Sequence, residues 1–325
     1  MFALPDSWVW DFWLAKEAAT YHLFFLHASR ALHDPDRRHM RAGIGHAIST
    51  DLVAWEQVSD AVVHGDAGSF DQTATWTGSV VKGPDGTWHM FYTGASRPDD
   101  TGHVQQIGLA TSTDLMTWTK HPDNPLITAD PRWYETLGGP PPWQDEHWRD
   151  PWVFPDPDGH GWHMLITARA NTGPLDDRGV VGHARSTDLL HWEVQPPLSQ
   201  PGAGFGHLEV FQVAEIDHRH VLIFNCLAPE LTPARKANGN TGGIWAVPAA
   251  SPLGPYDLAA AAPLTDNSLY VGKLVQDPTG AAVLLAFHNT GPDGDFVGTI
   301  TDPMPVHWEG DNLAITSAGG AAPSE

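Results

Sequence analysis

Three carboxylates, Asp11, Asp150 and Glu209, stand far apart in the sequence, yet each lies at the start of an apolar, strand-like segment. Cleavage of a glycosidic bond needs two carboxyl groups of different pKa, one protonated to donate to the leaving oxygen and one ionised. Three carboxylates with few neighbouring cations have such split pKa values when they meet. Each aspartate also has a structural interpretation: Asp150 could pair with Arg149 or form the turn before Pro151, and Asp11 could be a turn residue.

An internal repeat predicts the fold that would bring these positions together. The pattern G-x-A-x-S-T-D-L-x-x-W occurs at Gly45–Trp55, Gly108–Trp118 and Gly182–Trp192, with degenerate copies beginning at Gly243 and Gly298. Between the copies lie pairs of apolar segments joined by Gly/Asp turns, which is the pattern of β-hairpins. Four strands in each unit of about 60 to 70 residues, repeated five times, predict an all-β fold. We expect a five-bladed β-propeller with four-stranded antiparallel blades around a central channel.

The repeat also predicts structural roles and domain limits. Ser49, Ser112 and Ser186 are expected to occupy equivalent turns, because serine and aspartate side chains there bond to nearby backbone amides. We expect one propeller domain over residues 1–316, followed by a flexible tail over residues 317–325. The innermost strands are expected to start near residues 9, 77, 151, 208 and 270. They would line the channel and gather the three carboxylates in the same register at one mouth.

Composition excludes several classes of function. The chain has 17 Lys and Arg against 39 Asp and Glu, a formal net charge of −22, which repels phosphate backbones and anionic lipids. We therefore expect no nucleic-acid partner and no membrane association, and no apolar run is long enough to span a bilayer. The N-terminus shows no secretory signal, so a cytoplasmic location is expected. The oligomeric state is not predicted by the sequence.

Disulfide and metal chemistry are also disfavoured. The single cysteine, Cys226, excludes an internal disulfide framework and a cysteine-based zinc cluster. The 19 histidines include no H-E-x-x-H pattern, and those on strands beside aromatic residues are interpreted as hydrogen-bonded core residues. No cofactor and no metal are predicted, with a structural calcium ion held by oxygen ligands near the channel as the open alternative.

Several segments resemble two glycoside hydrolase families. Trp8–Trp13, which reads V-W-D-F-W after its first residue, resembles the V-W-D-S-W nucleophile segment of levansucrases in family 68. It also sits like the W-M-N-D-P-N segment of family 32 invertases. The other matching segments are Trp148–Pro151 with the R-D-P motif of both families, Thr77–Ser79 with F-S-G-S, His207–Glu209 with the acid/base region, and Tyr270–Val275 with the last-blade strand of family 32. The resemblance covers about residues 5 to 315.

This resemblance implies a role for each carboxylate. Asp11 would be the nucleophile, Asp150 would bind sugar hydroxyls and stabilise the transition state beside Arg149, and Glu209 would be the general acid/base. The implied activity is hydrolysis of fructofuranosides with retention of configuration, with fructosyl transfer as a side activity, on a small oligosaccharide or glycoside. The chain departs from the families in lacking N-D-P-N-G after Trp10 and E-C or E-R-P around Glu209.

Further residues are expected to bind the substrate. The insertion Gly138–His147 precedes the third blade and is expected to cover the pocket, because loops on a rigid scaffold commonly carry specificity. A surface loop rich in proline is the alternative interpretation. The full set of expected binding residues is Trp10, His27, Trp76, Ser79, Trp143, Gln144, Arg149, His207 and Lys273.

Two alternatives to a retaining fructofuranosidase stay open. The related family 43 also has five blades with two aspartates and a glutamate, but it inverts configuration on arabinofuranosides and xylosides. Ser251–Tyr256 would suit that family, and no family 32 C-terminal β-sandwich is expected after the fifth blade. The second alternative is a non-catalytic, carbohydrate-binding propeller, which would be favoured if the three carboxylates did not converge on one pocket.

Overall fold

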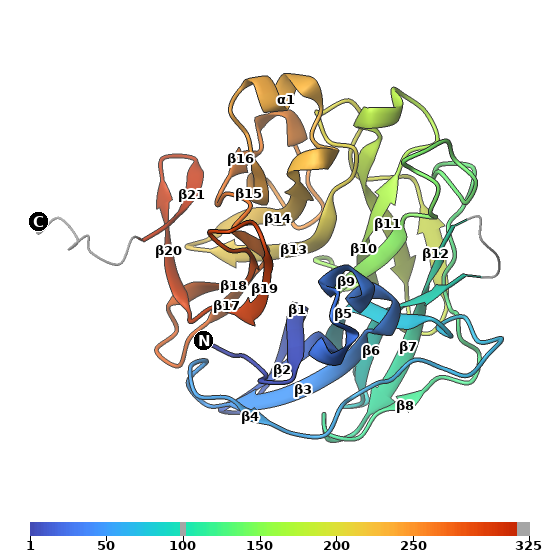
Figure 1. Ribbon diagram of the computed structural model, residues 1–325, viewed down its shortest axis with the longest axis vertical. Helices are drawn as coiled ribbons and strands as arrows, with labels where there is room; N and C mark the ends of the chain where they lie inside the picture. The colour runs from blue at the N-terminus through green and yellow to red at the C-terminus, as the bar shows by residue number, and fades with distance from the viewer. Residues whose placement is uncertain (98–101, 317–325) are drawn as a thin grey trace, which may run out of the picture.

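Five antiparallel sheets surround a central axis in the computed structural model, which describes residues 1–97 and 102–316 (Figure 1). Each sheet is one blade, and its strands follow one another from the channel outward, in the order β1-β2-β3-β4 for the first blade. The expected five-bladed, four-stranded architecture is confirmed. The expected tail over residues 317–325 lies outside the described residues. Within the part of the chain that is described, no helix is long and apolar enough to cross a membrane.

The strands and short helices have the following bounds. Blade one contains β1 (Ser7–Glu17), β2 (Thr20–Ser29), β3 (Gly43–Ser49) and β4 (Glu56–Gln57), with the 3₁₀ helices η1 (Arg30–Leu32) and η2 (Pro35–Arg41) between β2 and β3. Blade two contains β5 (Ala74–Lys82), β6 (Trp88–Ser96), β7 (Val104–Ser112) and β8 (Thr119–Lys120). Blade three contains β9 (Trp148–Pro155), β10 (Trp162–Arg169), β11 (Gly179–Ser186) and β12 (Trp192–Gln195), with η3 (Leu175–Asp177) before β11. Blade four contains β13 (Glu209–Ile216), β14 (Arg219–Leu227), β15 (Gly242–Ala249) and β16 (Ala262–Pro263), with η4 (Ala228–Glu230), α1 (Pro233–Ala237) and η5 (Leu258–Ala260). Blade five contains β17 (Leu269–Gln276), β18 (Ala282–Thr290), β19 (Phe296–Ile300), β20 (Met304–Glu309) and β21 (Asn312–Ile315).

The fifth blade differs from the other four. Its third strand is broken in two, so that β19 and β20 each pair with a different part of β18. The N-terminal segment joins this blade, because the backbone N–H and C=O groups of Phe2 bond to those of Ile300 at 2.8 Å each. Blade five therefore receives a short addition from the start of the chain, and this closes the ring between the first and last blades.

The repeated S-T-D-L-x-x-W segment forms the same turn in blades one, two and three. In blade two the Ser112 hydroxyl donates to Asp114 Oδ1 at 3.0 Å, and that carboxylate accepts backbone N–H groups two and three residues on. The indole N–H of Trp118 donates to the Leu115 carbonyl at 3.0 Å. Ser49 and Ser186 make the same contacts, so the predicted equivalence of the three turns is confirmed.

Aromatic and histidine side chains fill the blades. His22 Nδ1 and His46 Nε2 lie 3.0 Å apart inside blade one, and the His46 ring stacks on Phe24 at 4.5 Å between ring centroids. His163 and His183 form the equivalent pair in blade three at 2.8 Å. Burial of one phenylalanine such as Phe24 contributes about 1.5–3 kcal/mol to the stability of the fold. These histidines are core residues, as their positions beside aromatic residues indicated.

Each innermost strand carries a β-bulge at the same level of the channel. The extra residue lies between Trp10 and Phe12 in β1 and between Trp76 and Gly78 in β5. In β9, β13 and β17 two residues oppose one residue of the next strand. The bulge residues in chain order are Asp11, Thr77, Asp150, Val210 and Val271, and the last three have φ values of 56°, 52° and 49°. A bulge lets consecutive residues of one strand face the same side, which an ordinary strand forbids.

Candidate active site

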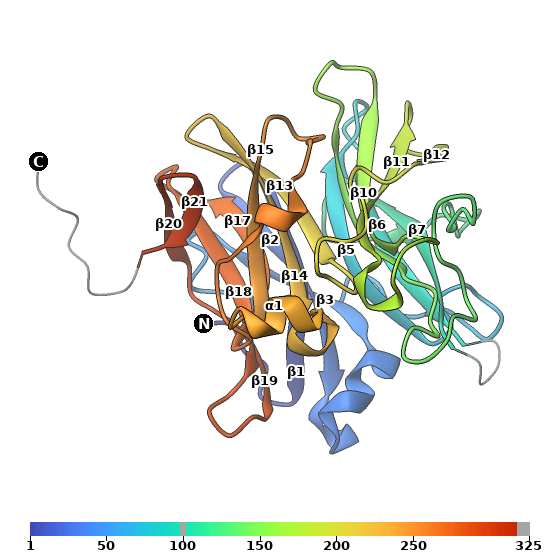
Figure 2. The same ribbon diagram turned by 90° about the horizontal axis from the view of Figure 1, so that it is seen from above.

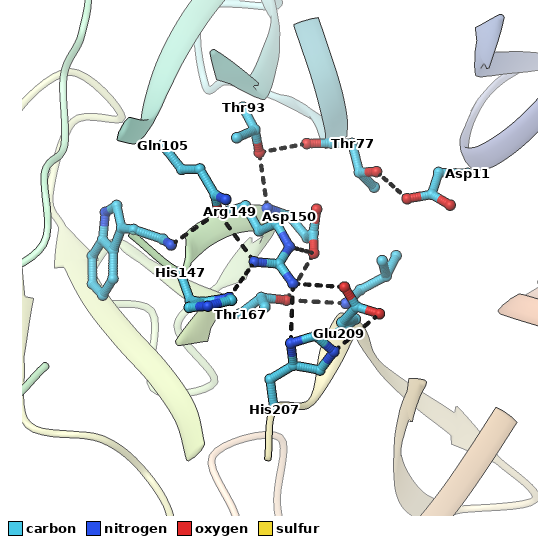
Figure 3. A network of polar contacts seen from close by, with 12 residues as sticks. Asp11, Thr77, Thr93, Gln105, His147, Arg149, Asp150, Thr167, His207 and Glu209 are labelled. Atoms are coloured by element: carbon cyan, nitrogen blue, oxygen red, sulfur yellow. Dashed lines mark hydrogen bonds and ion pairs between the residues drawn. The ribbon is translucent and has the colours of Figure 1, made fainter. Parts of the chain in front are cut away.

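The mouth of the channel holds a cavity of about 240 Å³ that all three predicted carboxylates line (Figure 3). They come from three different blades: Asp11 from β1, Asp150 from β9 and Glu209 from β13. The structure therefore brings the three carboxylates together in one pocket, as the sequence predicted. The residues lining the cavity are Trp10, Asp11, Leu26, His39, Trp76, Thr77, Gln105, Asp145, His147, Arg149, Asp150, His207 and Glu209.

The carboxylates occupy two levels rather than one. Asp11 and Asp150 are bulge residues, whereas Glu209 stands one residue before the bulge of its strand. The expectation that all three carboxylates share one register is therefore wrong for Glu209, which lies one residue earlier in its strand than the two aspartates. Residues equivalent to Glu209 are Trp10, Trp76, Arg149 and Tyr270, and they form a ring one level nearer the mouth.

Asp11 is held by a neighbouring blade. The hydroxyl of Thr77 donates to Asp11 Oδ2 at 2.5 Å, while Thr93 on the adjacent strand donates to the Thr77 carbonyl at 3.0 Å. Burial raises the pKa of Asp11 to about 6, and the charge of Glu209 acts in the same direction. The Thr77 hydrogen bond opposes this rise, because it stabilises the ionised carboxylate. Asp11 is therefore ionised only above about pH 6.

Hydrogen bonds hold both the backbone and the side chain of Asp150. Its N–H donates to the Thr93 hydroxyl at 2.9 Å, and its Oδ2 accepts from the Thr167 hydroxyl at 2.8 Å. Arg149 Nε lies 3.4 Å from the same oxygen, so the ion-pair interpretation from the sequence also holds. Burial raises the pKa of Asp150 to about 7, because the Arg149 charge offsets only part of the desolvation and Glu209 adds repulsion.

Glu209 is the carboxylate of the three whose ionised form is most strongly stabilised. Arg149 Nη2 donates to its Oε1 at 2.6 Å, and the Tyr270 hydroxyl donates to its Oε2 at 2.5 Å. His207 Nε2 lies 3.5 Å from Oε2. Burial alone would raise the pKa of Glu209, but His207 and Arg149 together hold it well below its ordinary value. The expectation of few neighbouring cations is therefore wrong, since Arg149 is central to the site.

Arg149 connects the carboxylates to two histidines. Its Nη1 donates to the Gln105 side-chain oxygen at 3.1 Å and to His147 Nδ1 at 2.9 Å, while Nη2 is 3.4 Å from His207 Nδ1. A guanidinium only donates, so His147 Nδ1 accepts and this ring carries its proton on Nε2. Burial, with the Arg149 charge adding to it, holds the pKa of His147 well below its ordinary value.

Four of the expected binding residues line the cavity: Trp10, Trp76, Arg149 and His207. Ser79 and Lys273 do not, because each lies two residues past the bulge of its strand and so faces the channel one level deeper. The Ser79 hydroxyl accepts from the Val153 N–H at 3.0 Å, and Lys273 Nζ donates to the Phe211 carbonyl at 3.1 Å. Both side chains link neighbouring blades, which corrects the expectation that they touch substrate.

The expectations for His27 and the inserted loop also need correction. His27 lies outside the cavity lining, with Nε2 3.3 Å from Asp60 Oδ2. Gln144 is exposed and does not line the cavity. Trp143 packs behind the cavity, where its ring lies 5.5 Å from each of the His147 and His207 rings. The inserted loop therefore lines the cavity through Asp145 and His147 instead.

Several cavity residues were missed by the sequence reasoning. Asp145 and His147 belong to the inserted loop that was singled out, so the right segment was found but the wrong side chains in it. Thr77 lies in a segment that was matched to F-S-G-S, yet only the bulge shows that its hydroxyl faces Asp11. His39 and Gln105 had no signal, because nothing in their sequence neighbourhood marks a cavity lining.

Comparison with known proteins identifies the family. The family model described as glycosyl hydrolases family 32 N-terminal domain matches residues 13–289, which is most of the chain. The insoluble isoenzyme 1 of beta-fructofuranosidase from Oryza sativa subsp. indica is 33% identical over 150 residues, covering 45% of this chain and 23% of the relative. The raffinose invertase of Escherichia coli is 30% identical over 192 residues, covering 58% of this chain and 34% of the relative.

Solved structures agree on the fold. The inulosucrase from Halalkalicoccus jeotgali bound to kestose superposes with a TM-score of 0.77 at 21% identity, covering 96% of this chain and 88% of that one. The match to the curated relatives spans about a third or less of their length. Of the families that the motifs resembled, family 32 is the one whose model matches, and the match spans four of the five innermost strands in full. The chain belongs to glycoside hydrolase family 32.

Proposed function

We propose that this chain hydrolyses β-fructofuranosides with retention of configuration, acting on small oligosaccharides. The observation that carries the proposal is the two-level arrangement of three carboxylates around one arginine in the cavity at the channel mouth. Such an arrangement provides both a nucleophile and a proton donor. The relatives named beta-fructofuranosidase and raffinose invertase support a fructofuranosyl group as the sugar that is transferred.

In this proposal the reaction has two steps. A carboxylate oxygen of Asp11 bonds to the anomeric carbon while the bond to the leaving oxygen breaks, and Glu209 donates its proton to that oxygen. Asp150 accepts hydrogen bonds from ring hydroxyls and holds the sugar in place. Water then attacks the anomeric carbon, Glu209 takes the water proton, and the Asp11 ester bond breaks. A sugar hydroxyl in place of water would give fructosyl transfer.

The proton inventory of the resting site determines the pH dependence. Burial raises the pKa of Asp11 to about 6 and that of Asp150 to about 7, so between these pH values the two carboxyl groups share about one proton. Glu209 is ionised in the empty site. The reaction needs this same single proton on Glu209, so hydroxyls that donate to Asp150 must favour its ionised form and release the proton. The profile of kcat/KM against pH should therefore be bell-shaped, with an acid limb where Asp11 ionises and a basic limb where the site loses its remaining proton.

The test is a substrate screen with product stereochemistry read by NMR. Sucrose, inulin-type and levan-type oligosaccharides and nitrophenyl arabinofuranoside are compared, and we expect fructose released first as the β anomer from the fructosyl substrates. Asp11→Asn should abolish turnover while sucrose binding, followed by calorimetry, is retained. Asp123→Asn is the matched control, because Asp123 is exposed and does not line the cavity.

Two outcomes would overturn the proposal. Initial release of the opposite anomer would make Asp11 a base that activates water, as in the inverting alternative. Binding of oligosaccharide without turnover by the unaltered chain would favour the non-catalytic alternative.

A further inference from the structure

We propose that His39 determines which leaving group is accepted, by hydrogen bonding to a hydroxyl of the sugar that departs. This inference rests on the proposed fructofuranosidase function and assigns a specificity role to a residue outside the three carboxylates. His39 lies in η2, the short helix between β2 and β3, and its side chain lines the cavity. Figures 1 and 2 show that this helical segment lies at the channel mouth and projects beyond the strands of blade one.

The backbone around His39 is held in place by the neighbouring blade. The indole N–H of Trp76 donates to the His39 carbonyl at 2.8 Å, and the Thr75 N–H donates to the carbonyl of Ala42 at 3.2 Å. The Arg38 guanidinium lies 3.7 Å from the centroid of the Phe296 ring, which anchors the helix on blade five. The position of the His39 ring is therefore set by blades one, two and five together.

The His39 imidazole itself has no hydrogen-bond partner within residues 1–97 and 102–316. Its ring contacts Trp10 and Trp76 edge to face, at 6.0 and 6.5 Å between centroids, and these contacts use no polar atom. The side chain is partly exposed to the cavity rather than sealed from it. The two ring nitrogens of His39 are therefore free to bond a hydroxyl of a ligand that enters the cavity.

The chemistry of this ring differs from that of the other polar groups in the site. Burial and the Arg38 charge lower the pKa of His39 to about 3, so the imidazole is neutral near pH 7. A neutral imidazole offers one donor and one acceptor. Arg149 only donates, and an ionised Asp11 only accepts, whereas His39 can do either toward a sugar hydroxyl.

The levels of the site indicate which sugar His39 meets. Asp11 and Asp150 lie at the bulge level, where the attacked sugar must sit. Glu209 lies one level nearer the mouth, where the glycosidic oxygen must receive its proton. His39 packs against Trp10 and Trp76, which share the level of Glu209, and it belongs to η2, the segment that projects beyond the strands of blade one. The group beyond the glycosidic oxygen, which is the leaving group, therefore faces His39.

The experiment compares two substrates that share the fructosyl group but differ in the leaving group. Sucrose releases glucose, which has hydroxyls, and methyl β-fructofuranoside releases methanol, which has none to offer beyond the cleaved oxygen. We expect His39→Ala to lower kcat/KM by about tenfold on sucrose, the size of one neutral hydrogen bond, and by less than about twofold on the methyl glycoside. Inhibition by free glucose should weaken in parallel, while inhibition by fructose should not change.

Two further variants complete the design. His39→Gln keeps a donor and an acceptor and should recover part of the sucrose activity. His33→Asn is the matched control, because His33 is an exposed histidine of the same loop whose φ of 60° asparagine tolerates. Equal losses on both substrates, or no loss on either, would refute the leaving-group role. An unaltered chain that turns over neither substrate would refute the proposed function itself, and this inference with it.

Discussion

The Thr77 hydroxyl provides a direct way to move the pKa of the proposed nucleophile. Thr77→Val replaces the hydroxyl with a methyl group of nearly the same volume and removes the 2.5 Å hydrogen bond to Asp11. Thr77 is almost fully buried, so the valine methyl takes the place of the hydroxyl and offers Asp11 no donor. The ionised form of Asp11 then loses a stabilising contact, and its pKa must rise above the present value of about 6.

The size of this rise follows from the strength of the bond. A hydrogen bond to a charged group contributes about 1.5–3 kcal/mol, and one pKa unit corresponds to about 1.4 kcal/mol. The pKa of Asp11 should therefore increase by about one to two units. At pH 6 the ionised fraction of Asp11 would fall from about half to about a tenth or less. The acid limb of the kcat/KM profile should move toward the basic limb set by Asp150, so that the profile narrows and its maximum falls.

The assay is kcat/KM for sucrose measured from pH 4.5 to 8.5 in the unaltered chain and in Thr77→Val. Thr77→Ser is the control, because it keeps the hydroxyl that donates to Asp11 and should keep the acid limb near pH 6. A uniform loss of activity in Thr77→Val with an unmoved acid limb would show that the hydroxyl positions Asp11 without setting its ionisation, and the reasoning above would be wrong.

Two other measurements follow from the site and the core. Glu209→Gln should lower kcat on sucrose by at least about a hundredfold, because the leaving oxygen then receives no proton, and it should affect fructosyl fluoride far less. Steady-state kinetics on the two substrates check this, and equal losses would contradict the acid role. Burial lowers the pKa of His46 to about 3, so folding keeps this ring neutral while the unfolded chain binds a proton below about pH 6.5. Its contribution to stability is therefore complete above pH 6.5 and declines as the pH falls toward 3. Urea unfolding from pH 7 to 4 should show a smaller slope of the free energy of unfolding against pH in His46→Gln, by up to about 1.4 kcal/mol per pH unit.

The blade architecture could be predicted from the sequence because each blade satisfies its own local rules. The S-T-D-L-x-x-W turn is closed by side chains within seven residues of one another, as the contacts of Ser112, Asp114 and Trp118 show. Such local hydrogen bonds leave a direct trace in the sequence. The broken third strand of blade five leaves none, because β19 and β20 are aligned by pairing with β18 and with Phe2, which lies about three hundred residues away.

The sequence was sufficient to predict the three carboxylates of the site, but not the level of the channel at which each side chain lies. A one-residue bulge changes which side chains face the cavity, and nothing in the residues around Asp11 or Glu209 shows where the extra residue lies. That is why Ser79 was expected where Thr77 stands. Arg149 was expected beside Asp150, yet its bond to Glu209 joins two blades and depends on the closed ring. The roles assigned to these residues stay predictions until the variants above are measured.

The bulges also place the reacting groups on different parts of the chain from the residues that select the substrate. Every group proposed to attack, hold or protonate the substrate is carried by an innermost strand, so the distances between these groups are set by the geometry of the closed ring. The side chains that meet the rest of the substrate come from connections such as residues 30–42 and 138–147. Exchange of those connections between relatives should therefore diversify substrate choice while leaving the reaction itself intact, which makes the mouth of this propeller the natural place for laboratory evolution.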